Sequence, residues 1–130
     1  MSLAFLPSVI VIDDNPVSRI ALTAILRQGH YRFLGEAANA EDGLALAAKL
    51  SPDIVCLDIV MPGHDGLDLL PRLRALRPKT VIIMVSGKSD AQTVKLAVAR
   101  GAAGFIVKPY TAEHVLNTVD GFAERLRRAA

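Results

Sequence analysis

The strongest constraint on the fold is a regular alternation of short apolar runs and longer helical patterns along the 130 residues. The runs are four to six residues long and bounded by turn-forming residues, and residues 8–12 and 80–85 are rich in β-branched side chains, which is typical of strands buried on both faces. The predicted strands are residues 8–12, 31–36, 54–57, 80–85 and 104–107. Such alternation predicts an α/β fold: a doubly wound, five-stranded parallel sheet with right-handed crossovers and five helices on its two faces.

Start and stop signals place the helices between these strands. Asn15 before Pro16 marks the first helix, since Asn caps free backbone N–H groups and proline fits the first helical position. Pro71 lies inside the third helix and predicts an irregular first half, because proline removes a backbone hydrogen bond. The predicted inward face of the first helix comprises Val17, Ile20, Ala21, Ala24 and Ile25.

Composition and length favour one globular domain. With 52% hydrophobic residues and a net charge of +2, the chain is neither disordered nor basic enough to predict direct binding of nucleic acid or of an anionic membrane. No apolar run approaches the roughly 18 residues of a membrane span. The single Cys56 cannot form an internal disulfide, which fits a reducing, cytoplasmic compartment. We expect the domain to cover residues 7–130, and residues 1–6 to be a leader that could include a cloning remnant.

Polar side chains stand where the predicted strands end. Asp13 and Asp14 follow the first strand, Asp58 the third, Ser86 the fourth and Lys108 the fifth. In a doubly wound sheet of order 2-1-3-4-5, the first and third strands are neighbours at the switch point, so the three carboxylates are expected to converge. Each residue taken alone is compatible with a turn or a solvated surface. Together, at successive strand ends, they indicate one site.

Three converging carboxylates repel one another unless cations intervene. Lys108 supplies one positive charge, and Mg²⁺ is the natural second cation because it binds oxygen ligands and needs only one or two carboxylates. Such a site suits phosphoryl transfer: Ser86 can donate a hydrogen bond to the phosphoryl group while Asp58 attacks in line.

The same residues carry a resemblance to a known family. The chain resembles the receiver domains of two-component response regulators, which have a flavodoxin-like fold, and the resemblance covers nearly the whole chain from about Pro7. The matching residues are Asp13-Asp14, the segment 58–66 (DIVMPGHDG), Ser86-Gly87, Gly101-Ala102 and residues 105–109 (FIVKP).

The resemblance implies a role for each matching residue. Asp58 would accept the phosphoryl group from a sensor histidine kinase or a histidine phosphotransfer protein. Asp14 and Asp58 would ligate Mg²⁺ directly, Asp13 would act through water, and the main-chain carbonyl of Val60 would be a further ligand. Lys108 would pair first with Asp58 and then with the phosphoryl group.

The resemblance also implies a switch. Ser86 would move toward the phosphoryl oxygen, Phe105 would rotate inward behind it, and the peptide bond between Lys108 and Pro109 would be cis. Phosphorylation would then change the face formed by the fourth helix, fifth strand and fifth helix. We expect this face to include Ala91, Lys95, Val98, Arg100 and Tyr110, and a phosphorylation-dependent homodimer through it remains open.

Two positions are expected to tune dephosphorylation. Val60, two residues after Asp58, cannot hydrogen-bond the attacking water, whereas Lys88, two residues after Ser86, could reach the phosphoryl group. A slowly hydrolysing phosphorylated form follows as a hypothesis. His64, in the loop after Asp58, is expected to be an exposed loop residue.

Three other functions were weighed against the phospho-receiver. An aspartyl-nucleophile phosphatase needs a second acid where Val60 stands. A dinucleotide-binding fold needs a glycine-rich loop where the chain has Asp13-Asp14-Asn15-Pro16. A degenerate receiver would be an unphosphorylated docking module, although no acceptor residue is missing. We expect no enzyme activity beyond catalysis of the chain's own phosphorylation and dephosphorylation.

Overall fold

The computed structural model describes residues 6–61 and 63–129. This description leaves out residues 1–5, Pro62, Ala130 and the side chain of His64. The predictions made for these residues therefore lie outside the described part of the chain. Within the described ranges, no helix combines the length and the apolar character needed to cross a membrane.

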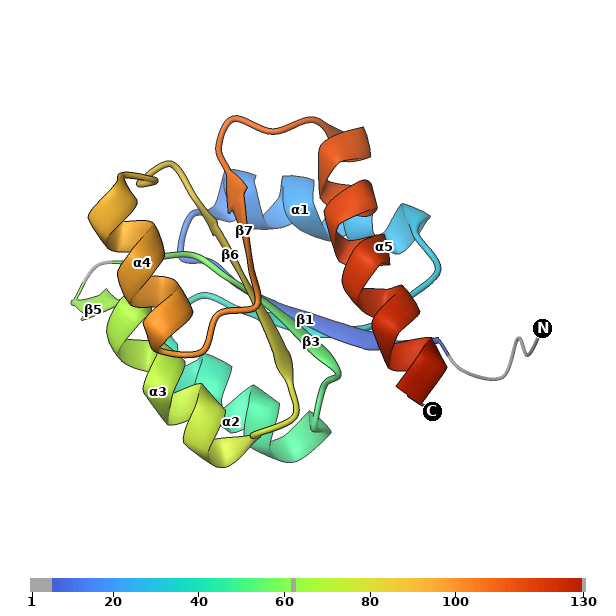
Figure 1. The fold of residues 1–130 in the computed structure, drawn as a ribbon, viewed down its shortest axis with the longest axis horizontal. Helices are drawn as coiled ribbons and strands as arrows, with labels where there is room; N and C mark the ends of the chain where they lie inside the picture. Colours follow the sequence, from blue (N-terminus) through green and yellow to red (C-terminus); the bar gives the residue numbers. More distant parts are fainter. Residues whose placement is uncertain (1–5, 62, 130) are drawn as a thin grey trace.

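The core of the fold is a five-stranded parallel sheet in the order β2-β1-β3-β6-β7 (Figure 1). Counted along the chain, these five strands stand in the predicted order 2-1-3-4-5. Their bounds are β1 Ser8–Ile12, β2 Arg32–Ala37, β3 Ile54–Leu57, β6 Val81–Ser86 and β7 Gly104–Val107. The two labels missing from this series belong to a small antiparallel hairpin, β4 Val60–Met61 and β5 His64–Asp65, which the sequence did not predict.

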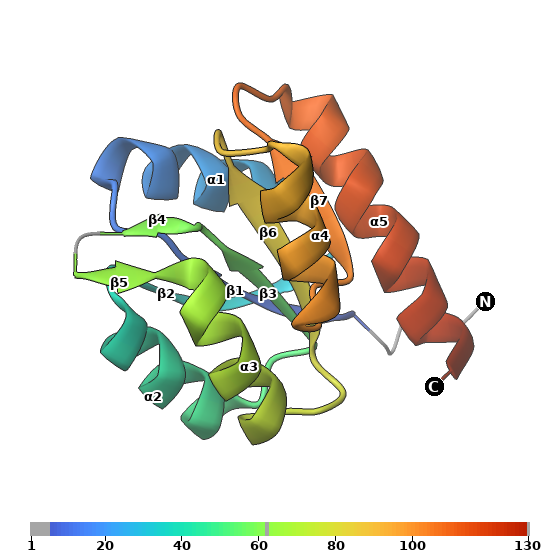
Figure 2. The same cartoon turned by 60° about the vertical axis from the view of Figure 1, so that its left-hand side comes forward.

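Helices cover both faces of the sheet (Figures 1 and 2). On one face lie α1 and α5, and on the other lie α2, α3 and α4. Their bounds are α1 Pro16–Gln28, α2 Ala40–Leu50, α3 Gly66–Leu76, α4 Ala91–Ala99 and α5 Ala112–Ala129. Because successive strand residues point to opposite faces, β1 sends Val9 and Val11 toward α1 and α5, and Ile10 and Ile12 toward the other helices.

The inward face predicted for α1 is wrong for most of its residues. Val17 and Ile20 are 77% and 65% exposed, and Leu22 and Leu26 fill the core instead. Apolar residues surround most of this helix, so spacing alone did not define one stripe. In this rotation of α1 about its axis, Ser18 and Arg19 face the residue after β1. Ser18 donates to the Asp13 side chain, and Arg19 donates to the Asp13 main-chain carbonyl.

The irregularity predicted in α3 is also absent, because the helix runs unbroken through Pro71. In a regular helix the N–H of residue 71 would bond the carbonyl of residue 67, and proline has no such group. Arg100, at the end of α4, donates from Nη1 to this Leu67 carbonyl at 2.8 Å and to Asp68 Oδ1 at 3.0 Å. The guanidinium therefore satisfies the acceptor that proline leaves free.

Candidate phosphorylation site

The backbone fixes the carboxylates of the site at adjoining strand ends. Asp13 follows β1 and its N–H bonds the Ala37 carbonyl of β2 at 3.0 Å, while the N–H of Asp58 bonds the Ile12 carbonyl at 2.9 Å. The parallel ladder thus continues one residue past β1 and β3. The acids are held by the sheet rather than by a free loop.

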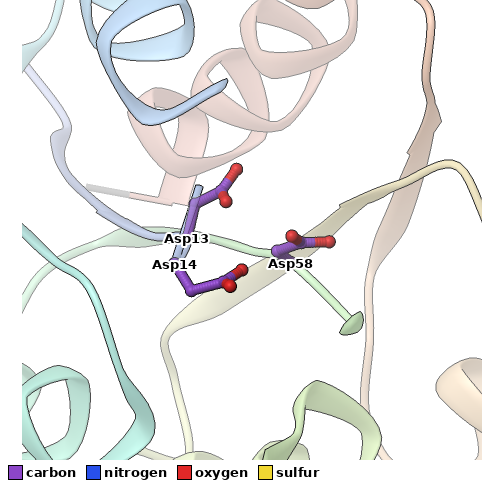
Figure 3. A group of neighbouring side chains, drawn as sticks. All are labelled: Asp13, Asp14 and Asp58. Atoms are coloured by element: carbon purple, nitrogen blue, oxygen red, sulfur yellow. The ribbon is translucent and has the colours of Figure 1, made fainter. Parts of the chain in front are cut away.

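Asp13, Asp14 and Asp58 form one cluster (Figure 3). Each offers a carboxylate oxygen, and these three oxygens lie within 4.8 Å of one another. Asp13 and Asp58 are buried and Asp14 is half-buried. Convergent carboxylate oxygens at a partly accessible rim are the ligands that a hard divalent cation such as Mg²⁺ prefers, so the donor set fits the expected ion.

Lys108 brings a positive charge to the same cluster. Its Nζ lies 3.3 Å from Asp13 Oδ2 and 3.7 Å from Asp58 Oδ2, and its backbone N–H bonds the Ser86 carbonyl at 3.0 Å. The peptide bond from Lys108 to Pro109 is cis. With all groups ionised, three carboxylates and one ammonium leave two negative charges, which one divalent cation would neutralise.

The electrostatics of Asp58 follow from this setting. Burial raises the pKa of its carboxyl from 3.8 to about 6; the Lys108 ammonium opposes that rise, and the nearby Asp13 carboxylate adds to it. Asp58 is thus a carboxylate that ionises near neutral pH and whose charge is poorly solvated. A cation that enters the cluster would reduce the repulsion between the Asp58 and Asp13 carboxylates.

The remaining predicted residues surround the cluster. Ser86 ends β6, the neighbour of β3, is 1% exposed, and its Oγ accepts the Lys88 N–H at 3.2 Å. Phe105 of β7 is half-buried and packs against the core on the α2–α4 side. Val60 is 62% exposed and Lys88 is exposed.

Two contacts to Asp13 were missed by the sequence reasoning. Ser18 donates from Oγ to Asp13 Oδ2 at 2.7 Å, and Arg19 donates from Nη1 to the Asp13 carbonyl at 2.8 Å. The available signal was the position of a hydroxyl and a guanidinium on the first helical turns after the acids. That signal is weak, because serine is common near helix starts.

Comparison with known proteins defines the family. Residues 9–120 match the response regulator receiver domain family. The chain therefore belongs to this family, whose members are the phospho-receiver modules of two-component signalling systems.

Relatives of different lengths share this domain. The chain is 37% identical to protein CcdB of Bacillus subtilis over 85% of its length and 92% of the relative. It is 33% identical to the chemotaxis protein CheY of Listeria monocytogenes, covering 88% of the chain and 97% of the relative. Against the nitrate/nitrite response regulator protein NarL of Escherichia coli, 33% identity covers 86% of the chain and only 52% of the relative. The chain thus spans nearly all of some relatives and about half of others.

Solved structures agree with the fold. The signal receiver domain of NarL from Mycobacterium tuberculosis superimposes with a TM-score of 0.85 and 29% identity, covering 92% of this chain and 97% of that one. A CheY-like receiver domain protein from Methanospirillum hungatei superimposes with a TM-score of 0.88 over 97% of this chain and 100% of that one, and its 24% identity supports the fold alone.

Proposed function

We propose that the chain accepts a phosphoryl group on Asp58 from the phosphohistidine of a sensor kinase or a phosphotransfer protein in the cytoplasm. The observation that carries the proposal is the cluster of Asp13, Asp14 and Asp58 within 4.8 Å, with the Lys108 ammonium between two of its members. An Asp58 oxygen forms the new bond to phosphorus, the phosphorus–nitrogen bond of the donor histidine breaks, and the imidazole leaves with its electron pair.

The residues present fit a bound Mg²⁺. Asp14, Asp58 and the main-chain carbonyl of Val60 would hold the ion directly, and Asp13 through water. When bound, Mg²⁺ neutralises the charge on the phosphoryl oxygens and so lowers the cost of their approach to a carboxylate. The Lys108 ammonium would also neutralise charge on the phosphoryl oxygens, since it already lies 3.7 Å from an Asp58 oxygen.

The switch uses residues beside the acceptor. The Ser86 hydroxyl donates to a phosphoryl oxygen, and Phe105 moves into the space behind it. These shifts alter the face formed by α4, β7 and α5, where Val98 and Val107 are 63% and 42% exposed. The chain acts on itself alone, so it is a switching module rather than an enzyme with a separate substrate.

Intact mass spectrometry tests the acceptor chemistry. The protein is incubated with a small acyl phosphate or phosphoramidate, with and without Mg²⁺, as wild type and as Asp58→Ala. We expect one added phosphoryl group that requires both Mg²⁺ and Asp58. An unmodified wild-type protein would favour the unphosphorylated docking module. Continuous release of inorganic phosphate from the donor, without a phosphorylated protein, would favour a phosphatase.

The lifetime of the phosphorylated form tests the tuning positions. Val60 offers no hydrogen bond to an attacking water, and the exposed Lys88 carries a positive charge two residues after Ser86. We expect slow hydrolysis, and faster hydrolysis in Val60→Asn, whose amide can orient water. A wild-type phosphoryl lifetime of only seconds contradicts this part of the proposal.

A further inference from the structure

Three protein donors hold the Asp13 carboxylate. This side chain is almost fully buried, and residue Asp13 is only 1% exposed. Oδ1 accepts the Asn15 N–H at 2.9 Å, and Oδ2 accepts the Ser18 hydroxyl at 2.7 Å and the Lys108 ammonium at 3.3 Å. Of these contacts, the one from Ser18 is the shortest.

The Ser18 hydroxyl is itself fixed by the start of α1. Asn15 caps this helix, and its side-chain oxygen accepts the Ser18 N–H at 3.0 Å. Arg19 holds the Asp13 carbonyl at 2.8 Å and pairs with Glu36 of β2 at 2.9 Å. The first turns of α1 therefore hold both the main chain and the side chain of Asp13.

Ser18 and Lys108 share one oxygen of Asp13, and Lys108 also lies 3.7 Å from Asp58. The hydroxyl satisfies part of the hydrogen-bonding capacity of Oδ2 and holds the carboxylate in one orientation. Without it, the Asn15 N–H at Oδ1 and the Lys108 ammonium at Oδ2 hold the carboxylate less tightly, and we expect the ammonium to move toward Asp13 and away from Asp58. The Ser18 contact thus affects two members of the cluster at once.

We propose that Ser18 is a positioning residue for the metal and phosphoryl site: its hydroxyl orients the Asp13 carboxylate and so sets the affinity of the cluster for Mg²⁺. The proposal rests on the proposed function, because it takes the cluster as the Mg²⁺ site. Hydrogen bonds from outside the ligand set orient the ligands of metal sites, and their removal typically costs about 10–100-fold in metal affinity.

Calorimetric titration with Mg²⁺ alone tests the role of Ser18. We expect Ser18→Ala to weaken Mg²⁺ binding about tenfold, at the lower end of the usual range. Ser18→Cys, which keeps the size but is a weak donor, should show a similar loss. Ser18→Thr, which keeps the hydroxyl, should bind nearly as wild type.

Thr93 offers a matched control. It occupies the corresponding place in the first turn of α4, and its hydroxyl donates to Asp90 Oδ1 at 2.6 Å, a carboxylate outside the cluster. Thr93→Val removes a hydroxyl–carboxylate bond of the same kind and should leave Mg²⁺ affinity unchanged. Thermal unfolding without Mg²⁺ reports the purely structural cost of each variant and confirms that it is folded.

The outcomes separate the inference from the function on which it rests. Wild-type affinity in folded Ser18→Ala and Ser18→Cys would overturn the role of Ser18 while leaving the site in place. An equal loss in Thr93→Val would also overturn it, since the effect would then be a general one. A wild-type protein that binds no Mg²⁺ would overturn both the site and the role of Ser18.

Discussion

At the scale of single residues, the site concentrates unfavourable charge at Asp58. The folded-state pKa of about 6 lies above the unfolded value of 3.8, so folding disfavours the ionised form. The contribution of Asp58 to stability is therefore greatest below the unfolded pKa and is lost as the pH rises through about 6. In the absence of Mg²⁺, the acceptor residue destabilises the protein at neutral pH.

Replacing this charge should stabilise the fold. Without Mg²⁺ at pH 7, Asp58→Asn is expected to raise the free energy of unfolding by about 2 kcal/mol, because the amide carries no charge to desolvate. The gain should shrink as the pH is lowered from 6 to 4. Urea unfolding at several pH values measures it. A variant less stable than wild type at pH 7, or a difference independent of pH, would contradict this electrostatic account.

The sequence predicted which residues lie in the cluster but not how they are held. Asp13, Asp14 and Asp58 each follow a predictable strand, and strand order then brings them together. Ser18 escaped notice because its contact with Asp13 depends on the rotation of α1 about its axis. That rotation is a property of tertiary packing, and a helix with apolar residues on several sides does not encode it locally.

At the scale of elements, the five parallel strands were predicted to within about one residue at each end, because each is a short run bounded by turn-forming residues and separated from the next by a helical pattern. The β4–β5 hairpin was missed since two-residue strands carry no periodicity. Pro71 misled the prediction for α3, because the compensating donor, Arg100, is 29 positions further along the chain. Local rules identify the broken hydrogen bond but not the distant group that replaces it.

The pairing of Arg100 with Pro71 can be measured by a double-mutant cycle. We expect Arg100→Ala to cost about 2 kcal/mol in the wild type, because it leaves the Leu67 carbonyl without its charged donor. In a Pro71→Ala background the cost should fall by about 1 kcal/mol, since the restored N–H bonds the same carbonyl.

Arg72 is the control for this cycle. It lies on the same helix as Pro71 and makes an exposed pair with Glu41 at 3.5 Å, so Arg72→Ala should change stability by less than about 0.5 kcal/mol. Equal costs of Arg100→Ala in the two backgrounds would show that the guanidinium does not replace the missing bond.

At the scale of the whole molecule, exposed apolar side chains lie on both sides of the sheet. Val98 on α4 and Val107 on β7 are 63% and 42% exposed, on the face proposed to respond to phosphorylation. Ile20 on α1 is 65% exposed, on the helix layer across the sheet. A dimer formed through the α4–β7–α5 face would cover the first group and leave Ile20 in solvent.

Sedimentation of the phosphorylated protein distinguishes these surfaces. If phosphorylation drives dimerisation through the α4–β7–α5 face, Val98→Glu should weaken the dimer at least tenfold, because it places a charge in an apolar contact. Ile20→Glu, an equally exposed substitution, should leave it intact. Loss of the dimer in Ile20→Glu alone would move the interface to α1, and a phosphorylated protein that stays monomeric would remove homodimerisation from the proposal.

The most direct test of the central claim is to locate the phosphoryl group itself. An acyl phosphate on aspartate is reduced by borohydride to homoserine, which marks the acceptor permanently and can be found by peptide mass spectrometry. After treatment with a small phosphodonor and Mg²⁺, we predict homoserine at residue 58 and at no other aspartate, and none without Mg²⁺. Homoserine at Asp13 or Asp14, or a phosphorylated protein with residue 58 unreduced, would contradict the assignment of Asp58 as the acceptor.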